Sequence, residues 1–405
     1  MKSIPYAAAL SVVLTLVSLP VGAEPDEAPD ANDAAAEEPS TTGEFLFGSY
    51  GRTQFELDDR GNAGTANNIV SHGPRLFQED YAEFDLSYTL TQPDGFTSRV
   101  LFTFALFGPF AHYDGDFTDQ AFAVRNLYAE MSGLGAPLEG LSLWAGSRMY
   151  RGDDIYLLDW WPLDELNTVG GGASWRASQE PGGFEARVHA GVNRLDDDYQ
   201  LQIIDVPAQP VGTRSKVLLD RQRLLSSARL EYAEHDLLAK WGAKAILYGE
   251  YHRLPEGERI SPELIEAGAP IQQEDLLLET LPSDDGFVLG TQLGLFESDT
   301  ANHLNLFFRW SRGIAAFGEL GVPFGTTEAG TADGADELLG ALSGNWESRW
   351  VGVLAGAYLR RFEDADANET DLDDFSEGAV VLRPAVFITD HFHQAVELSY
   401  QRKNP

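Results

Sequence analysis

The sequence predicts an all-β fold, a transmembrane antiparallel β-barrel, and three observations support this prediction. After the first residues, no stretch approaches the roughly 18 uninterrupted apolar residues that a membrane-spanning helix needs. Segments of about ten residues with alternating polar and apolar side chains recur along the chain. Their connections are alternately short and long, and a closed sheet of such strands pairs every backbone group in lipid. The content of 40 Gly and 11% aromatic residues agrees with this fold class.

The beginning of the chain resembles an export signal followed by an acidic leader. Lys2 supplies a positive charge, an apolar run follows, and small residues ending at Ala23 form a cleavage site. We therefore expect residues 1–23 to be a signal peptide. Residues 24–43, rich in Ala, Pro, Glu and Asp, cannot bury enough apolar surface to fold and are expected to be a disordered leader on the periplasmic side. Residues 44–405 form the predicted barrel.

Charge and cysteine content exclude several functions. The 64 acidic residues outnumber the 28 basic residues, and a net charge of −36 repels the phosphates of nucleic acids. The chain has no cysteine, so neither a disulfide nor a lipoprotein anchor is expected. Residues 364–368 begin like a calcium loop but lack its Gly and final Glu, and His391 and His393 have no evident third ligand. We expect no cofactor and no metal site.

The strands can be followed in order from Phe45. In residues 45–57, alternation places Phe45 and Phe47 on one face, expected to meet lipid, and Tyr50 and Arg52 on the other, expected to line the lumen. The turn at 92–95 predicts a tight hairpin between the strands at 78–88 and 96–107. Further strands are predicted at 122–128, from 143, and at 173–178, 183–194, 224–232, 241–252, 286–296, 301–312, 337–345, 348–361, 376–389 and 392–402. The inserts 195–220, 253–285 and 313–336 are expected to be extracellular loops.

The strand that starts at Leu143 passes into an unusual run of charged and aromatic residues. The run contains Arg151, Asp153, Asp154, Tyr156, Asp159, Trp160 and Trp161. Aromatic faces beside charged groups suit a sugar, which offers apolar faces for stacking and a rim of hydroxyls for hydrogen bonds. The three aspartates allow another interpretation, the acid and base pair of a glycosidase.

The pattern W-A-G-x-R-x-Y-x-x-x-D-x-x-x-x-D, from Trp144 to Asp159, resembles the maltoporin family of sugar-selective outer-membrane porins. The resemblance implies an eighteen-stranded barrel that assembles as a homotrimer, with a loop around 150–168 that folds inward and narrows the channel. Only about fifteen strands can be counted here. The resemblance therefore also suggests that the sequence is truncated at its C-terminal end.

The resemblance further implies two tracks of channel-lining residues. The aromatic track, on which sugar faces stack, comprises Tyr50, Tyr81, Tyr156 and Trp161, and the polar track comprises Arg52, Arg75, Glu83, Arg125, Arg151, Asp154 and Asp159. The alternative for the aromatic residues is an interfacial girdle, and for the charged residues a solvated lumen or loop. The chain departs from the family at Gly152 and Ala123, where the family has arginines. Arg151 and Arg125 are expected to replace these, and Tyr113 or Phe117 a family Trp.

The function implied by the resemblance is facilitated diffusion of carbohydrates, of the maltodextrin type, through the outer membrane of a Gram-negative cell, without enzymatic activity. A general, cation-preferring diffusion porin is an alternative, because the departures above fall on sugar-contact positions. A secreted soluble β-sheet lectin or glycosidase is a more remote alternative.

Overall fold

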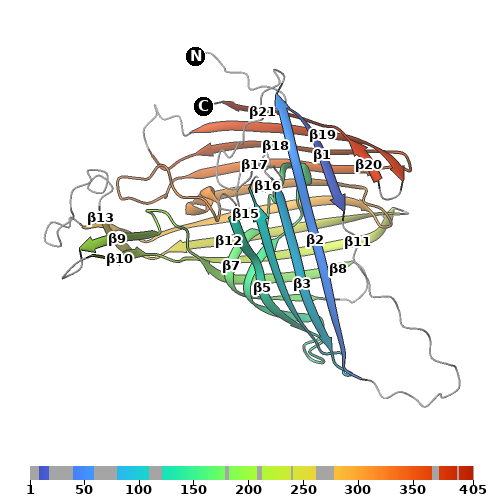
Figure 1. The fold of residues 1–405 in the computed structure, drawn as a ribbon, viewed down its shortest axis with the longest axis horizontal. Coiled ribbons are helices and arrows are strands. Elements are labelled where there is room, and N and C mark those ends of the chain that lie inside the picture. The colour runs from blue at the N-terminus through green and yellow to red at the C-terminus, as the bar shows by residue number, and fades with distance from the viewer. Residues whose placement is uncertain are drawn as a thin grey trace.

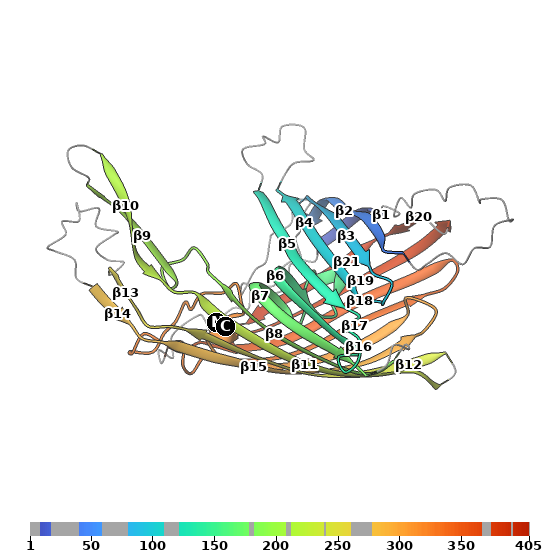
Figure 2. The same cartoon turned by 90° about the horizontal axis from the view of Figure 1, so that it is seen from below.

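The computed structural model describes residues 9–17, 40–58, 80–108, 121–177, 182–207, 212–238, 240–260, 278–366, 374–389 and 392–404. Within these ranges, no helix has both the length and the apolar character to cross a membrane. The described chain is almost entirely strand, arranged as one large curved antiparallel sheet with two small hairpins (Figure 1, Figure 2). The predicted all-β class is therefore confirmed.

The strands of the large sheet follow one another in chain order. They are β1 (Ala9–Val17), β2 (Thr42–Asp58), β3 (Tyr81–Thr91), β4 (Thr97–Phe107), β5 (Ala121–Ser132), β6 (Leu141–Arg151), β7 (Glu165–Arg176), β8 (Gly183–Asn193), β11 (Arg223–Leu238), β12 (Trp241–Leu254), β15 (Asp284–Glu297), β16 (His303–Gly313), β17 (Asp336–Glu347), β18 (Val351–Glu363), β19 (Phe375–Thr389), β20 (Phe392–Ala395) and β21 (Glu397–Asn404). Each pairs with its neighbour in this order, except that β20 and β21 both pair with β19.

The strand β1 pairs with β2 along its whole length and with β21 over three residues. The hydrogen-bonded neighbours therefore return to the start of the series. β1 lies within residues 1–23, and the removal of this segment as a signal peptide stays a prediction. The leader at 24–43 lies mostly outside the described residues, although β2 already begins at its last two residues.

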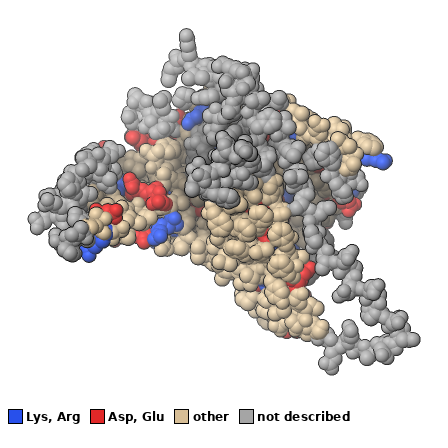
Figure 3. Space-filling view, viewed as in Figure 1, with Lys and Arg blue, Asp and Glu red and all other residues tan. Residues whose placement is uncertain are grey.

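The alternation along β2 and β3 produces the two faces expected from the sequence. Phe45 and Phe47 are 63% and 48% exposed on the outer face. On the inner face, Tyr50 pairs with Glu83 across the two strands. The surface over β2, β3 and β5 that is visible in Figure 3 carries few charges, and charged residues gather toward β9, β10 and β13. An uncharged band of this kind is typical of barrels that face lipid.

Two of the long inserts contain strands that the sequence did not predict. β9 (Leu201–Pro207) pairs with β10 (Thr213–Asp220), and β13 (Gly257–Ile260) pairs with β14 (Leu278–Leu281). Both hairpins project beyond the large sheet in Figure 2. They differ from the expectation of plain loops because each hairpin satisfies its own backbone hydrogen bonds without the large sheet.

The strand β7 starts eight residues earlier than the segment predicted at 173–178. It includes Gly170, Gly171 and Gly172, which pair with both β6 and β8. A Cβ added to Gly170 would lie 2.1 Å from the carbonyl oxygen of Ala190. The glycine run therefore allows close approach of neighbouring backbones within the wall, which explains why alternation of side chains could not reveal the strand.

Candidate functional site

The segment from Gly152 to Asp164, here called the constriction loop, leaves β6 and returns to β7 across the inside of the barrel. Its two ends meet, because the amide of Gly152 donates to the carbonyl oxygen of Asp164 at 3.1 Å. Arg229 on β11 donates to the carboxylate of Asp164 at 3.1 Å. The base of the loop is therefore tied both to itself and to the wall.

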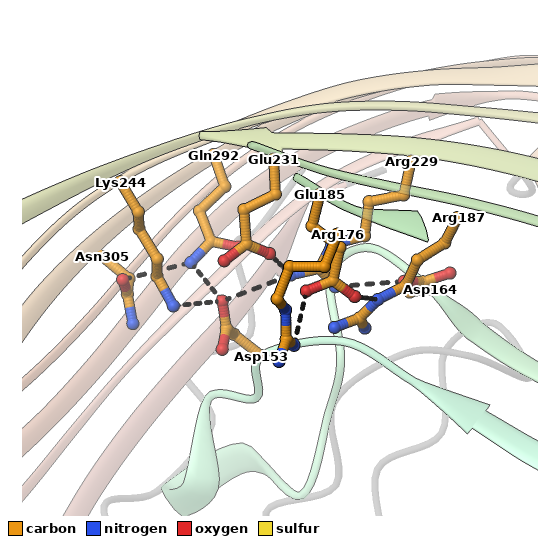
Figure 4. Close-up of polar contacts among 10 residues, drawn as sticks. All are labelled: Asp153, Asp164, Arg176, Glu185, Arg187, Arg229, Glu231, Lys244, Gln292 and Asn305. Atoms are coloured by element: carbon orange, nitrogen blue, oxygen red, sulfur yellow. Dashed lines mark hydrogen bonds and ion pairs between the residues drawn. The ribbon is translucent and has the colours of Figure 1, made fainter. Parts of the chain in front are cut away.

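A second tie holds Asp153, near the start of the loop. Lys244 on β12 and Gln292 on β15 both donate to the same carboxylate oxygen of Asp153, at 2.6 and 2.7 Å (Figure 4). Burial raises the pKa of this carboxyl, but Lys244, Arg229 and Gln292 outweigh burial and hold the pKa below its ordinary value. Asp153 is thus an ionised anchor.

The apex of the constriction loop is apolar and packs against the opposite wall. A short helix, η2 (Tyr156–Leu158), turns the chain, and the amide of Ile155 donates to the carbonyl oxygen of Trp160 at 2.8 Å. Ile155, Leu158 and Trp160 are at most 1% exposed. Their cluster includes wall residues of β12 and of β15 to β19, namely Tyr248, Val288, Phe307, Leu339, Ala341, Tyr358, Ala379 and Val381. Apolar burial therefore fixes the loop inside the barrel.

The remaining side chains of the constriction loop carry the predicted site residues. Tyr156 is 40% exposed, and the guanidinium carbon of Arg383 lies 5.2 Å from the centre of its ring. The guanidinium carbon of Arg151 lies 4.9 Å from the centre of the Trp161 ring. Burial and the nearby aspartates raise the pKa of Asp154. The face left open by the loop is therefore aromatic and charged, as its composition suggested.

The inner face of β2 and β3 brings further predicted residues together. The rings of Tyr50 and Tyr81 lie 6.1 Å apart, and the hydroxyl of Tyr81 donates to Glu83. Arg125 of β5 and Asp159 of the constriction loop both interact electrostatically with Tyr81. These five residues come from β2, β3, β5 and the loop, so the fold assembles them into one group.

Arg125 and Arg151 are the expected replacements for family arginines, and the guanidinium groups of both contact other residues of the barrel wall. Nε and one terminal nitrogen of Arg125 lie 3.0 and 2.8 Å from the sulfur of Met149. Arg151 donates to the carbonyl oxygens of Tyr150 and Leu166 and to the side chain of Asn167. Arg151 is therefore a wall-bound residue with its flat face against Trp161, and less of its donor capacity remains for a solute.

Several predicted residues cannot be placed. Arg75, Tyr113 and Phe117 lie outside the described residues, as does His391. The backbone of Arg52 pairs with Tyr81, but its side chain is not described. Their roles stay predictions.

A second loop, residues 314–335, folds inward and packs against the wall, whereas the sequence predicted a plain extracellular loop at 313–336. It begins with the helix η3 (Ile314–Phe317), all four residues of which are fully buried. Arg223 of β11 donates to the carbonyl oxygens of Gly318, Glu319 and Gly321 at 2.6, 3.1 and 2.7 Å. One buried arginine therefore fixes the backbone of this loop, which we call the latch loop.

The carboxylate of Glu319 reaches from the latch loop to the far strands. One oxygen accepts a hydrogen bond from the backbone amide of Asn167 at 2.6 Å, and the other accepts one from the side-chain amide of Asn193 at 2.9 Å. Burial raises the pKa of Glu319 from 4.5 to about 7. The signal that could have drawn attention to it is a lone acidic residue among small and apolar neighbours.

Comparison with known proteins gave one informative match. The family model described as LamB porin matches residues 45–405. Among curated proteins, none matches this sequence.

Similar solved structures are outer-membrane channels of low identity. Salmonella typhi OmpF in complex with daunomycin is 10% identical, with 90% of this chain and 97% of that chain covered and a TM-score of 0.41. Pseudomonas putida OprB at high pH is 9% identical, with 90% and 94% covered and a TM-score of 0.42. Acinetobacter baumannii DcaP is 10% identical, with 90% and 98% covered and a TM-score of 0.40.

Proposed function

Because the chain belongs to the LamB porin family, whose members are sugar-selective channels of the outer membrane, we propose that its solutes are maltodextrin-type oligosaccharides. As a member of this family it is a carbohydrate channel and not an enzyme. The observation that carries the proposal is the group of Tyr50, Tyr81 and Glu83 opposite Asp159 of the constriction loop.

In the proposed mechanism, the apolar faces of a glucose chain slide over Tyr50 and Tyr81 while its hydroxyls exchange hydrogen-bond partners. Glu83 and Asp159 accept hydrogen bonds, and Arg125 donates them. The exposed ring of Tyr156 and that of Trp161 extend the aromatic surface along the loop. Many weak sites of similar strength are needed, because binding must favour uptake and still permit release.

We also propose that the channel is a homotrimer embedded in outer-membrane lipid, as the family implies. The support is the outer face of the first strands, where Phe45, Phe47 and Phe122 are 63%, 48% and 62% exposed. Neighbouring subunits or lipid would cover these rings. Chemical cross-linking in detergent tests the assembly, and a species no larger than one chain would refute it.

The decisive measurement is the conductance of single channels in a planar bilayer, titrated with maltodextrins of increasing length. We expect a saturable block of the ion current that tightens as the sugar becomes longer, because a longer chain contacts more of the track. Stable conductance without block would instead favour the general diffusion porin. Reversal potentials in a salt gradient would then show whether that porin prefers cations.

The aromatic track is tested by Tyr81→Ala. Loss of one stacking ring is expected to weaken maltodextrin block roughly 2- to 10-fold, with ion conductance unchanged or higher. Tyr88→Ala is the matched control, because Tyr88 lies on the same strand, seven residues away and therefore on the opposite face, and is 51% exposed. Equal block in the two variants would remove Tyr81 from the track.

A further inference from the structure

A cavity of about 830 Å³ lies inside the barrel against β5 to β8, at the end where short turns join the strands. Its lining includes the turn residues Asp94 and Glu139 and, on the wall, Glu130 and Arg148. Sites for small molecules commonly measure about 300–1,000 Å³. The cavity shares only Arg151 with the two tracks proposed above, so it is a separate place for a solute.

Arg148 is held in this cavity by a cage of aromatic rings. Its guanidinium carbon lies 4.5 Å from the ring centre of Tyr128, 5.0 Å from that of Trp144 and 5.3 Å from that of Tyr150. Trp144 stacks in turn on His189 at 5.5 Å. None of these rings is more than 7% exposed, so they cannot stack a sugar themselves. Their effect is to fix the position of the guanidinium before any ligand binds.

Within the part of the chain that the structure describes, the N–H groups of Arg148 make no hydrogen bond. Among the described residues, the nearest carboxylate oxygen is that of Glu130, at 3.8 Å, which exceeds a hydrogen-bond distance. The side chain is 24% exposed, although the cage covers its flat faces. A caged guanidinium with unused N–H groups is suited to a planar anion, which it can bind through two parallel hydrogen bonds.

The neighbouring wall adds charged side chains that can bind hydroxyl groups. Arg176 and Arg187 both donate to the carboxylate of Glu185, at 2.8 and 2.5 Å (Figure 4). Over the whole lining, four arginines, Arg148, Arg151, Arg176 and Arg187, balance four carboxylates, those of Asp94, Glu130, Glu139 and Glu185. Paired arginine and glutamate side chains offer both donors and acceptors, the combination that a rim of hydroxyl groups requires.

We propose that Arg148 and this cavity form a second saccharide site, which binds the carboxylate of an acidic sugar such as a uronic acid. The inference rests on the proposed sugar-channel function and extends its substrates from neutral to acidic saccharides. Arg148 binds the carboxylate, and Arg176, Arg187 and Glu185 bind the hydroxyls. Short turns of outer-membrane barrels face the periplasm, so the site lies on the periplasmic side of the constriction loop.

The test compares digalacturonate with maltose, two disaccharides that differ in charge, on the full-length channel in planar bilayers. Each sugar is added from the short-turn side at constant ionic strength. Digalacturonate is expected to block the wild-type current at lower concentration than maltose does. Arg148→Gln is expected to weaken the digalacturonate block roughly 10- to 100-fold, because hydrogen bonds to a charged group are lost. Maltose block should not change.

Three further variants separate binding from a structural role. Glu130→Gln removes the nearest competing carboxylate and is expected to tighten the digalacturonate block, an effect opposite in sign to that of Arg148→Gln. Arg148→Lys keeps the charge without the planar fork and should give intermediate block. Arg361→Gln removes the same charge from an exposed position paired with Glu363, so it should behave as wild type.

The outcomes are distinguishable. Equal digalacturonate block in wild type and Arg148→Gln, weaker block in Glu130→Gln, or no digalacturonate block in a wild-type channel that maltodextrins do block would overturn the acidic-sugar site and leave the proposed function intact. Absence of block by maltodextrins would instead count against the proposed function. If Arg148→Gln does not fold, the Glu130→Gln and Arg148→Lys channels decide the question.

Discussion

The constriction loop and the latch loop both fold into the barrel and both bury apolar side chains, but the polar contacts that hold them differ. The constriction loop is held by side chains at both its base and its apex. Ion pairs at Asp153 and Asp164 hold the base, and an apolar cluster around Trp160 holds the apex. The latch loop also buries an apolar cluster, which contains Ile314 and Phe317, but its polar contacts go to its backbone, because Arg223 binds three of its carbonyl oxygens. Of the two loops, only the constriction loop contributes a residue to the group around Tyr81, namely Asp159.

This difference indicates that the constriction loop contacts the solute and that the latch loop mainly stabilises the barrel. A loop anchored by its apex can keep its other side chains free for a solute, as Tyr156 shows with 40% exposure. The latch loop buries its η3 residues completely and adds one carboxylate, Glu319, beside β7 and β8. We therefore expect variants of the first loop to change sugar passage and variants of the second to change mainly stability.

The largest effect is expected from Trp160→Ala in the constriction loop. Removing a ring that is 1% exposed should destabilise the docked loop by about 3–5 kcal/mol. The loop would then leave the opposite wall, and single-channel conductance should rise. Trp161→Ala is the control, because its half-exposed ring lies against Arg151 and not in the apolar cluster. Similar conductance in both variants would contradict anchoring by the apex.

The next effect is expected from Arg223→Met in the wall behind the latch loop. Three buried carbonyl oxygens would lose their donor, at a cost of about 3–4 kcal/mol in total. Protease cleavage within residues 314–335 should become fast while maltodextrin block changes little. Arg221→Met is matched to it, because Arg221 is equally buried and donates to the carbonyl oxygens of Tyr199, Pro255 and Pro282 instead. Cleavage within residues 314–335 in both variants would show that Arg223 has no specific role in holding the latch loop.

The stability of the latch loop is expected to depend on pH through Glu319. Because burial raises its pKa from 4.5 to about 7, the folded state binds more protons than the unfolded state between these values. Stability should therefore fall as pH rises from 4.5 to 7, by on the order of 3 kcal/mol, and level off above. Glu319→Gln should remove this dependence.

Amide hydrogen exchange of residues 314–335 provides the measurement. The rates of wild type are compared with those of Glu319→Gln at each pH, so that the intrinsic effect of pH on exchange cancels. A ratio that stays constant from pH 4.5 to 7 would mean that Glu319 does not titrate in this range.

The smallest effect is expected from Lys244→Met, which removes one tie of the constriction loop. Asp153 keeps Gln292 and the more distant Arg229 and is itself 31% exposed, so the expected loss is small, about 1 kcal/mol. The ion current should become noisier with little change in mean conductance. Lys240→Met, which removes a cation paired with Glu297, serves as control. A conductance rise as large as that of Trp160→Ala would show that Lys244, and not the apex, holds the loop.

The sequence by itself determined the class of the fold, and its resemblance to the maltoporin family indicated the location of the constriction. Alternation alone separated Phe45 and Phe47 from Tyr50, because successive side chains of a strand point to opposite faces. The turn at 92–95 was readable because its chemistry is local, and the amide of Gly95 does donate to the carbonyl oxygen of Gln92. The dense run of charged and aromatic residues after Leu143 indicated a binding surface, and only the family resemblance implied that this loop turns inward.

Only the tertiary structure decided what these local features meet. Glu319 binds Asn167, 152 positions away in the chain, and Arg223 binds Gly318, 95 positions away. The caged Arg148 depends on Tyr128 and His189 from two other strands. The partners of the loops are set by the curvature of the sheet, which brings distant strands to face one another across the lumen. Those of Arg148 are set by the order of neighbouring strands in the wall. A pattern of period two records which face a side chain takes, but not which residue lies opposite it.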